Sequence, residues 1–332
     1  MTFIAFVIRR FGQALFVMAA AAAVAFLLFQ YVGDPVNNMV GQAATSADRA
    51  ELRRALGLDA SPAIQFLRFL GNAATGDFGI SYRLGQPVSQ VIGERLPATL
   101  ELSFVAMLFA LGAGIPFGVY TALKRKAVSS RLLLTVSLIG VSLPTFMIGI
   151  LLILTFSVWL GWLPSFGRGQ VLDLGLWSTG LLSVSGLAAL VLPAVTLGLF
   201  QMTLITRLVR AEMLEVLRQD YIKFARARGL SPRAINFGHA LKNTLVPVIT
   251  IAGLQLGNVI AFSIIVETVF QWPGMGQLII QAIQFGDVPV MAAYIVLIAF
   301  LFVTINLAVD VLYFVIDPRL RFDRTVSAGG GG

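Results

Sequence analysis

The 332-residue chain contains no cysteine and a single histidine, His239. Without cysteine it has no disulfide framework, no thiolate nucleophile and no thiolate metal site. One imidazole is too few for the sites that hold catalytic zinc. No Gly-Lys dipeptide occurs, so the phosphate-binding P-loop is missing, and there is neither an HExxH nor a GxSxG motif. We therefore expect no catalytic residue, no metal and no cofactor in this chain.

Charged residues are also scarce, at 12% of the chain, while hydrophobic residues make up 58%. This composition is typical of an integral membrane protein rather than of a soluble domain. The net charge of +8 would favour nucleic-acid binding only if the basic residues shared one aqueous domain, but they lie in short segments between apolar stretches. Basic residues in such positions set membrane topology, so we expect contact with membrane lipid and none with nucleic acid.

Long uncharged stretches predict an all-α integral membrane protein with six transmembrane helices. The expected spans cover about 11–33, 102–123, 132–160, 187–206, 245–266 and 288–309. We expect Pro144 to kink or unwind the third span and Pro193 to break the fourth. The first stretch has the basic start of a cleaved signal peptide, but it is longer than the usual apolar core, and we interpret it as a retained helix.

Basic residues are distributed unequally between the two sides of this arrangement. With both termini in the cytoplasm, the predicted cytoplasmic segments hold 17 of the 24 Lys and Arg residues, and the external segments hold 7. Seven spans would place Arg319, Arg321 and Arg324 outside, against the positive-inside rule. The predicted parts are the cytoplasmic N-terminus and first helix (1–33), an external loop subdomain (34–100), a five-helix core (101–318) with a cytoplasmic loop at 207–245, and a cytoplasmic tail (319–332) whose final glycines are typical of a linker.

Two segments between the spans have the composition of structured surface elements. In the external subdomain we expect short helices at 47–57 and 62–70, followed by turns and extended chain at 76–87. Residues 268–286 are uncharged but rich in glutamine and glycine. We interpret them as a turn followed by an amphipathic helix at the membrane interface, and not as a span.

One segment, Arg207–Pro247, carries eight basic and three acidic residues within an otherwise apolar chain. At roughly 2.5–3.5 kcal/mol for each charge at the bilayer centre, these residues cannot lie in hydrocarbon. Apolar side chains recur at helical spacing from Met213 to Ala225, which predicts an amphipathic helix that ends near Gly229. Ser231-Pro232 then predicts the start of a second short helix. We expect the two short helices to meet at a corner on the cytoplasmic surface.

Three polar residues stand out because of where they lie. Glu267 is near the external end of the fifth span and Asp310 is in the sixth, and acids within membrane spans are functional candidates. An alternative is that Glu267 bonds to nearby backbone or to the Gln271-Trp272 turn at the interface, and that Asp310 pairs with a cytoplasmic basic residue. For His239, packing or hydrogen bonding is favoured over catalysis. The candidate gate or path residues are Pro144, Asn258 and Glu267.

In several of these segments the chain resembles the permease subunits of bacterial ABC importers, specifically the dipeptide/oligopeptide permease family. The charged segment is similar to their cytoplasmic EAA loop, most strongly in DYIKFARARGLSPRAINFGHALKNTLVPVIT at 220–250. Further matching segments, in the expected order, are GDFGISYRLGQPV (76–88), ERLPATLEL (94–102), GWLPSFGRG (161–169), ETVFQWPGMGQL (267–278) and DVLYFVIDPRLR (310–321). Aligned on Gly229, the chain has Lys223, Phe224 and Ala225 where the general pattern begins Glu-Ala-Ala, and Lys242 where the pattern has proline.

The resemblance implies a type I importer permease fold, multi-pass in a bacterial inner membrane, in a subunit that does no chemistry itself. Its implied partners are a homologous second permease subunit, two ATPase subunits that hold ATP and magnesium, an external substrate-binding protein and a di- or oligopeptide. The residues implied to couple to the ATPase are Ala225, Arg226, Ala227, Arg228, Gly229, Leu230, Ser231, Pro232, His239 and Ala240. A rigid helix pair bent at Gly229 can convert closure of the ATPases into movement of the spans. We also hypothesise that 34–100 forms a cap that receives the binding protein.

Other functions stay open at this point. Members of the same family carry nickel, glutathione, opines or oligosaccharides. An alternative from another class is a channel or secondary transporter that works alone. In that case Glu267 and Asp310 would carry ions, and the charged segment would be a surface loop without a role in transport. A membrane enzyme is disfavoured by the absent motifs. Transport by this chain alone without ATP would separate the channel from the importer, and co-purification with an ATPase subunit would separate all three.

Overall fold

The computed structural model describes residues 3–31, 47, 59–175 and 177–316. In this part of the chain five helices are long and apolar enough to cross a membrane, and a bent helix pair supplies a sixth span when it is counted as one. The five are α1 (Phe3–Tyr31), α5 (Val88–Leu123), α8 (Val184–Val216), α10 (Leu241–Val269) and α12 (Val288–Ile316). The expected all-α membrane fold is confirmed.

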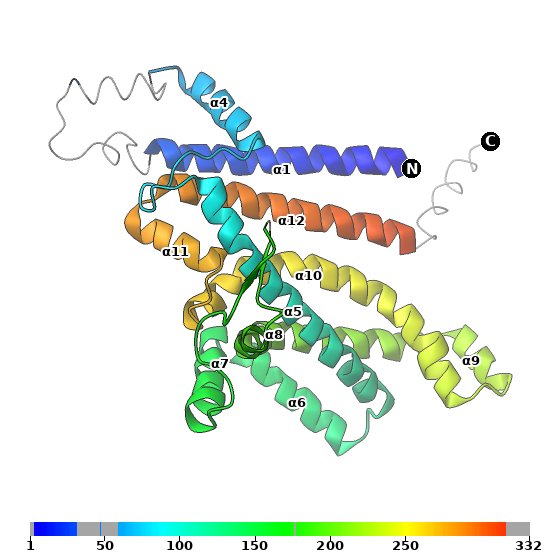
Figure 1. Cartoon of the computed structure of the whole chain (residues 1–332). Coiled ribbons are helices and arrows are strands. Elements are labelled where there is room, and N and C mark those ends of the chain that lie inside the picture. Colours follow the sequence, from blue (N-terminus) through cyan, green and yellow to red (C-terminus); the bar gives the residue numbers. More distant parts are fainter. Residues whose placement is uncertain (1–2, 32–46, 48–58, 176, 317–332) are drawn as a thin grey trace, which may run out of the picture.

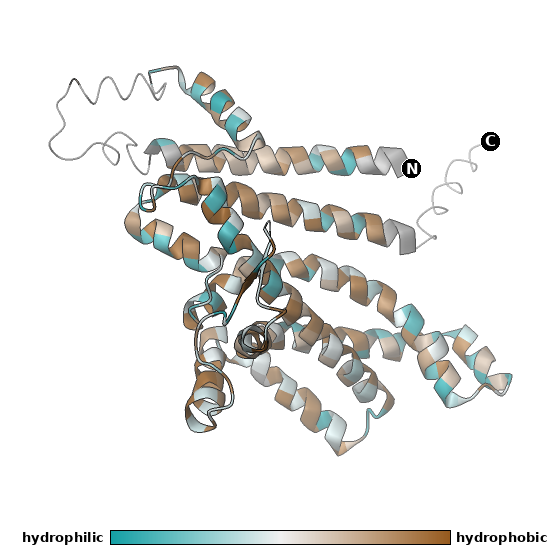
Figure 2. Cartoon of the chain, in the orientation of Figure 1, coloured by the Kyte–Doolittle hydropathy of each residue, from teal (hydrophilic) through white to brown (hydrophobic). Residues whose placement is uncertain are grey.

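Shorter elements connect these helices. They are α4 (Pro62–Ala74), α6 (Val128–Ser142), α7 (Thr145–Leu152), the π-helix η1 (Ile153–Trp159), the strands β1 (Leu172–Asp173) and β2 (Ser178–Thr179), α9 (Asp220–Ala227), the π-helix η2 (Ala234–Ala240) and α11 (Met275–Phe285). The two strands pair antiparallel, with Leu172 opposite Thr179. Figure 2 shows that hydrophobic residues dominate the long helices, whereas α4 and α9 carry more hydrophilic ones.

The core of the molecule is the packing of α5 against α8, where glycines let the two backbones approach closely. A Cβ atom added to Gly118 would lie 2.5 Å from the Cβ of Val209, and one added to Gly198 would lie 2.6 Å from the carbonyl oxygen of Ala106. Gly114, one turn before Gly118, is similarly close to Ile205 on α8. Small residues at this spacing are typical of helix pairs in membranes, because close backbone approach maximises van der Waals contact there.

The third span is broken near Pro144, as the sequence predicts. α6 ends at Ser142, α7 begins at Thr145, and the two helices are bent by 108° relative to one another. Proline lacks the amide hydrogen that would continue the helix. With 15 residues, α6 is roughly 22 Å long, which is shorter than the hydrocarbon layer of about 30 Å. The second half, Thr145–Trp159, has the same number of residues, so neither half is long enough to cross the membrane by itself.

The fourth span differs from the prediction, because Pro193 does not break it. α8 is continuous from Val184 to Val216, and Pro193 is buried within it. Neighbouring helices make an internal proline tolerable in a membrane helix. With 33 residues, α8 is roughly 50 Å long and extends beyond the hydrocarbon layer. The stretch from Arg207 to Val216 is thus the end of a spanning helix and not part of a separate surface helix.

The segment before the second span also differs. α5 begins at Val88, well before the expected start near residue 102, so part of the predicted external loop is helical. The helix expected at 62–70 is confirmed as α4, which packs on α1 through Phe66 and Phe26, with ring centroids 5.4 Å apart. The helix expected at 47–57 lies outside the described residues except for Ala47, as does the tail at 319–332.

The described ends of the chain lie at the same end of the molecule. α1 and α12 run side by side, with the start of α1 next to the end of α12 (Figure 1). α9 and the turn between α5 and α6 are also at this end (Figure 1), which we call the α9 end. The opposite end, which we call the α11 end, contains α11 and the turn at 76–87 (Figure 1).

Candidate functional site

The charged segment forms α9, a short amphipathic helix that is held against the core along one face. Ile222 is 0% exposed and Ala225 is 8% exposed, and both belong to the same buried cluster as Ile235 and Ala240. The side-chain amide of Asn243 donates a hydrogen bond of 2.8 Å to the hydroxyl of Tyr221, which ties α9 to the first turn of α10. Packing and this bond together limit independent movement of α9.

A left-handed residue at Gly229 ends α9. Its φ of +77° is a conformation that favours glycine, although a Cβ atom there would meet nothing within 4 Å. The N–H of Gly229 donates to the carbonyl of Arg226 at 3.0 Å, and the N–H of Leu230 donates to the carbonyl of Ala225 at 3.3 Å. These two bonds make a Schellman motif, so the structure contains a corner where the sequence predicts one.

The helix after the corner begins at Pro232, and the hydroxyl of Ser231 accepts a hydrogen bond of 3.3 Å from the N–H of Ala234. This start agrees with the predicted cap. The predicted length does not agree, because η2 continues directly into α10, and residues 234–269 form one long apolar helix. The helix that follows the corner is therefore itself a candidate membrane span.

The break between α8 and α9 was not predicted. α8 ends at Val216 and α9 starts at Asp220, so the apolar stripe that suggests one helix belongs to two. The intervening residues, Leu217, Arg218 and Gln219, include no glycine or proline to mark a break. The one signal is Asp220, whose carboxylate favours a helix N-terminus. The Lys223 ammonium, 2.8 Å away, holds the pKa of Asp220 below its ordinary value and keeps this charge in place.

The outer face of α9 and its corner is exposed and carries both aromatic and basic side chains. Phe224 is 64% exposed, and the Arg228 guanidinium lies 5.8 Å from the centre of its ring. Of the ten residues assigned to coupling, eight are exposed, namely Arg226, Ala227, Arg228, Gly229, Leu230, Ser231, Pro232 and His239. Ala225 and Ala240 are buried, so they hold α9 in place and cannot touch a partner. His239 is exposed, and its preferred role in packing or hydrogen bonding stays a prediction.

A cavity of about 320 Å³ lies between α7, α8 and α10, beside the break at Pro144. Its walls are Thr145, Leu197, Phe200, Gln201, Gln255, Asn258, Val259, Phe262 and Ile265. Asn258 is thus a wall residue, and Pro144 immediately precedes the wall residue Thr145. Glu267, the third candidate path residue, does not line this cavity.

Glu267 instead ties three elements together at the α11 end. Its side chain is fully buried. It accepts hydrogen bonds from the hydroxyl of Thr99 on α5 at 2.6 Å, from the hydroxyl of Ser263 at 3.0 Å, and from the N–H groups of Gly276 and Gln277 at 2.7 and 3.1 Å. The last two belong to the first turn of α11, where a carboxylate is favoured. The geometry favours the structural alternative for Glu267 over a path role.

Sequence reasoning missed a second buried carboxylate, Glu101 on α5. It forms an ion pair of 2.7 Å with Arg168, and both side chains are at most 5% exposed. Arg168 also donates to the carbonyl of Ser178 at 2.7 Å, and the indole of Trp177 donates to Glu101 at 3.1 Å. The pair anchors the loop between η1 and α8 to α5. The signal available was a lone acid and a lone base in neighbouring apolar stretches.

The turn at 76–87 is anchored in the same way. Asp287, at the start of α12, is 3% exposed and bonds with the hydroxyl of Ser81 and the N–H of Tyr82. The Arg83 guanidinium lies 3.9 Å from the centre of the Phe285 ring on α11. Three buried carboxylates thus fasten the α11 end.

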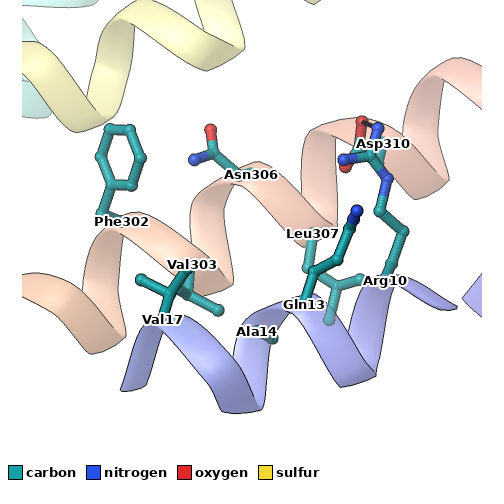
Figure 3. A pocket seen from close by; sticks show the side chains of 9 residues that line it. All are labelled: Arg10, Gln13, Ala14, Val17, Phe302, Val303, Asn306, Leu307 and Asp310. Carbon is teal, nitrogen blue, oxygen red and sulfur yellow. Dashed lines mark hydrogen bonds and ion pairs between the residues drawn. The ribbon is translucent and has the colours of Figure 1, made fainter. Parts of the chain in front are cut away.

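Asp310 pairs with Arg10 at 3.0 Å across α1 and α12 at the α9 end. Figure 3 shows the two side chains meeting at one end of a small pocket, which they line together with Gln13, Asn306 and apolar residues. This is the pairing with a basic residue that the sequence suggests for Asp310. Among the described residues, no group of three or more His, Asp or Glu side chains could hold a metal ion.

Comparison with known proteins identifies the relatives of this chain. A putative peptide transport system permease protein of Brucella abortus (strain 2308) is 40% identical over 321 residues, covering 96% of this chain and 99% of the relative. The di/tripeptide transport system permease protein DppB of Pseudomonas aeruginosa (strain UCBPP-PA14) is 40% identical over 335 residues, covering 97% and 100%. The dipeptide transport system permease protein DppB of Escherichia coli (strain K12) is 37% identical over 336 residues, covering 95% and 98%.

The fold has a solved counterpart in an inward-facing structure of the MetNI methionine ABC transporter. The TM-score is 0.56 at 23% identity, and the match covers 69% of this chain and 97% of that one. The shared fold is that of a type I ABC importer permease. The family described as "Binding-protein-dependent transport system inner membrane component" matches residues 114–322, and the model of its N-terminal part matches 3–103. The chain is therefore a multi-pass inner-membrane protein and belongs to this family of transport components.

Proposed function

We propose that this chain is the permease subunit of an ATP-driven, binding-protein-dependent importer of di- or oligopeptides, in which it forms half of the translocation path. Relatives at 37–40% identity over nearly the whole chain are named as dipeptide or di/tripeptide permeases, which supports the peptide class. The alternative substrates are nickel, glutathione, opines and oligosaccharides, which other members of the family carry. The observation that supports coupling to an ATPase is the exposed aromatic and basic face of α9, because the opposite face of this helix is packed against the core.

In the proposed topology the α9 end faces the cytoplasm and the α11 end faces outward. Lys124, Arg125 and Lys126 lie in the turn between α5 and α6, at the same end as α9 and the start of α1 (Figure 1). Short segments rich in Lys and Arg are retained in the cytoplasm. Both termini are then cytoplasmic, and the segment between α1 and α5 is external. We propose that this segment receives the binding protein.

The proposed partners are a homologous permease subunit, two ATPase subunits that hold ATP and magnesium, and the external binding protein. Aromatic residues and arginine are enriched among the residues that dominate protein–protein affinity. Phe224 and Arg228 provide such a pair on the outer face of α9, while Ile222 and Ala225 fix the inner face. Movement imposed on α9 by an ATPase would pass through the Gly229 corner into the single helix at 234–269.

The rival function of a self-sufficient ion channel or secondary transporter has less support. It requires Glu267 and Asp310 to face a path. Glu267 is enclosed by Thr99, Ser263 and the start of α11, and Asp310 is paired with Arg10. Neither carboxylate lines the cavity between α7, α8 and α10.

The test is uptake of labelled dipeptide into proteoliposomes in which the binding protein is presented to the external face. We expect uptake only when this chain, its partner permease, both ATPase subunits, the binding protein and ATP are present together. Uptake by this chain alone without ATP would overturn the proposal in favour of the channel.

A further inference from the structure

The cavity between α7, α8 and α10 is lined by neutral polar groups and apolar side chains, without a charged residue. Its polar side chains are the hydroxyl of Thr145 and the amides of Gln201, Gln255 and Asn258. Gln201 and Asn258 lie near the middle of α8 and α10, and Thr145 is at the break of the third span. Transporters often place substrate sites near the bilayer midplane beside a discontinuous helix.

One of these amides has an oxygen without a hydrogen-bond partner in the described part of the chain. Gln201 is 7% exposed, and its Oε1 is buried and has no hydrogen-bond partner there. A buried amide oxygen without a partner is unfavourable, and most such groups in proteins are satisfied. Because the Gln201 side chain lines the cavity, rotation of its amide about the terminal torsion angle can present either the oxygen or the NH₂ group to a ligand.

The other two amides are linked to each other but retain bonding capacity. Asn258 Nδ2 donates a hydrogen bond of 2.6 Å to Gln255 Oε1. This bond uses one donor of Asn258 and one lone pair of Gln255, and each primary amide has two donors and two acceptor lone pairs. The bond also fixes the two side chains relative to one another on one face of α10.

We propose that this cavity is a transient binding subsite for the peptide backbone, in which the Gln201 and Asn258 amides hydrogen-bond the peptide groups of the transported substrate. The inference rests on the proposed function and names the residues and the chemistry by which the path holds its cargo. A peptide group offers one N–H donor and one C=O acceptor, which a primary amide matches in both directions. Without a charged wall residue, the subsite accepts neutral, acidic and basic dipeptides alike.

The experiment measures labelled dipeptide taken up per ATP hydrolysed, in proteoliposomes that hold the complete transporter with its binding protein. The double variant Gln201→Leu/Asn258→Leu should lower this ratio roughly tenfold, because two neutral hydrogen bonds are worth a factor of this order. Stimulation of the ATPase by the loaded binding protein should be unchanged, since α9 is not altered. The same fold-loss is expected for a neutral, an acidic and a basic dipeptide.

The matched control is Ile251→Leu, which changes an exposed apolar residue of α10 outside the cavity at nearly constant volume and should leave the ratio unchanged. If the double variant does not assemble, the single variants Gln201→Met and Asn258→Leu should each lower the ratio roughly threefold. A wild-type ratio in the assembled variants, or a loss confined to one charge class of dipeptide, would overturn the subsite while the proposed function stands. Failure of the wild-type transporter to move any peptide would overturn the proposed function and the subsite together.

Discussion

Three carboxylates at the α11 end and the charged residues of α9 are held in opposite ways. At the α11 end, three carboxylates, Glu101, Glu267 and Asp287, are at most 5% exposed and are bonded to turns that follow or precede the spans. At the α9 end, the charges of α9 are exposed, and Asp220 pairs with Lys223 within the surface helix. The first arrangement fixes loops to the helix bundle, whereas the second leaves a charged surface for a partner.

This difference separates stability from coupling. Substitutions at the α11 end should lower the stability of the folded chain, because they leave buried polar groups unpaired. Substitutions on the outer face of α9 should leave stability nearly unchanged and should act on the transmission of motion instead. Substitutions at both ends, taken from the largest expected effect on stability to the smallest, test this separation.

The largest effect is expected for Arg168→Met. It would leave the Glu101 carboxylate buried without its partner, and breaking such a pair costs about 3–5 kcal/mol. The measurement is thermal unfolding of the purified transporter in detergent. The control is Glu101→Leu/Arg168→Met, which removes both charges and should recover much of the loss. A single variant as stable as the wild type would show that the pair does not anchor the loop.

A smaller loss is expected for Glu267→Ala, which removes the acceptor for Thr99, Ser263 and the first turn of α11. We expect a loss of about 2–3 kcal/mol, because several buried donors are left unsatisfied. The midpoint of thermal unfolding and proteolysis within residues 268–286 report the change. The control is Thr268→Ala, which changes the exposed residue next to Glu267 and should leave the unfolding midpoint nearly unchanged. If Glu267 carried ions instead, the variant would fold normally and fail only in transport.

Much of the fold and of the corner at Gly229 could be predicted from the sequence, and the features that were missed have physical causes. The spans, the break at Pro144 and the corner at Gly229 follow from apolar length and from proline and glycine chemistry. The Glu101–Arg168 pair was missed, because the two residues are far apart in sequence and the tertiary structure brings them together. The break after Val216 was missed because the apolar period continues through it. Pro193 was misjudged because packing, rather than local propensity, decides whether a buried proline breaks a helix.

A still smaller effect on stability is expected for Gly229→Val, since a side chain at φ +77° costs about 1–2 kcal/mol but meets no neighbour. The strain should be relieved by movement of the corner, so ATP hydrolysis and peptide uptake should become uncoupled. The ratio of uptake to hydrolysis measures this. Gly229→Asn is the matched control, because asparagine tolerates the left-handed conformation and should retain most coupling. Normal coupling in Gly229→Val would contradict the role of the corner.

Cross-linking from Phe224 tests whether α9 is the surface through which an ATPase drives this chain. The chain has no cysteine, so Phe224→Cys can be labelled with a thiol-reactive photo-cross-linker at one position only. Leu182→Cys, which is 66% exposed in the loop before α8, is the control. We expect Phe224→Cys to cross-link to the ATPase subunit and the cross-linked transporters to stop importing peptide, while Leu182→Cys gives no ATPase adduct. An ATPase adduct from Leu182→Cys and none from Phe224→Cys would contradict this role of α9.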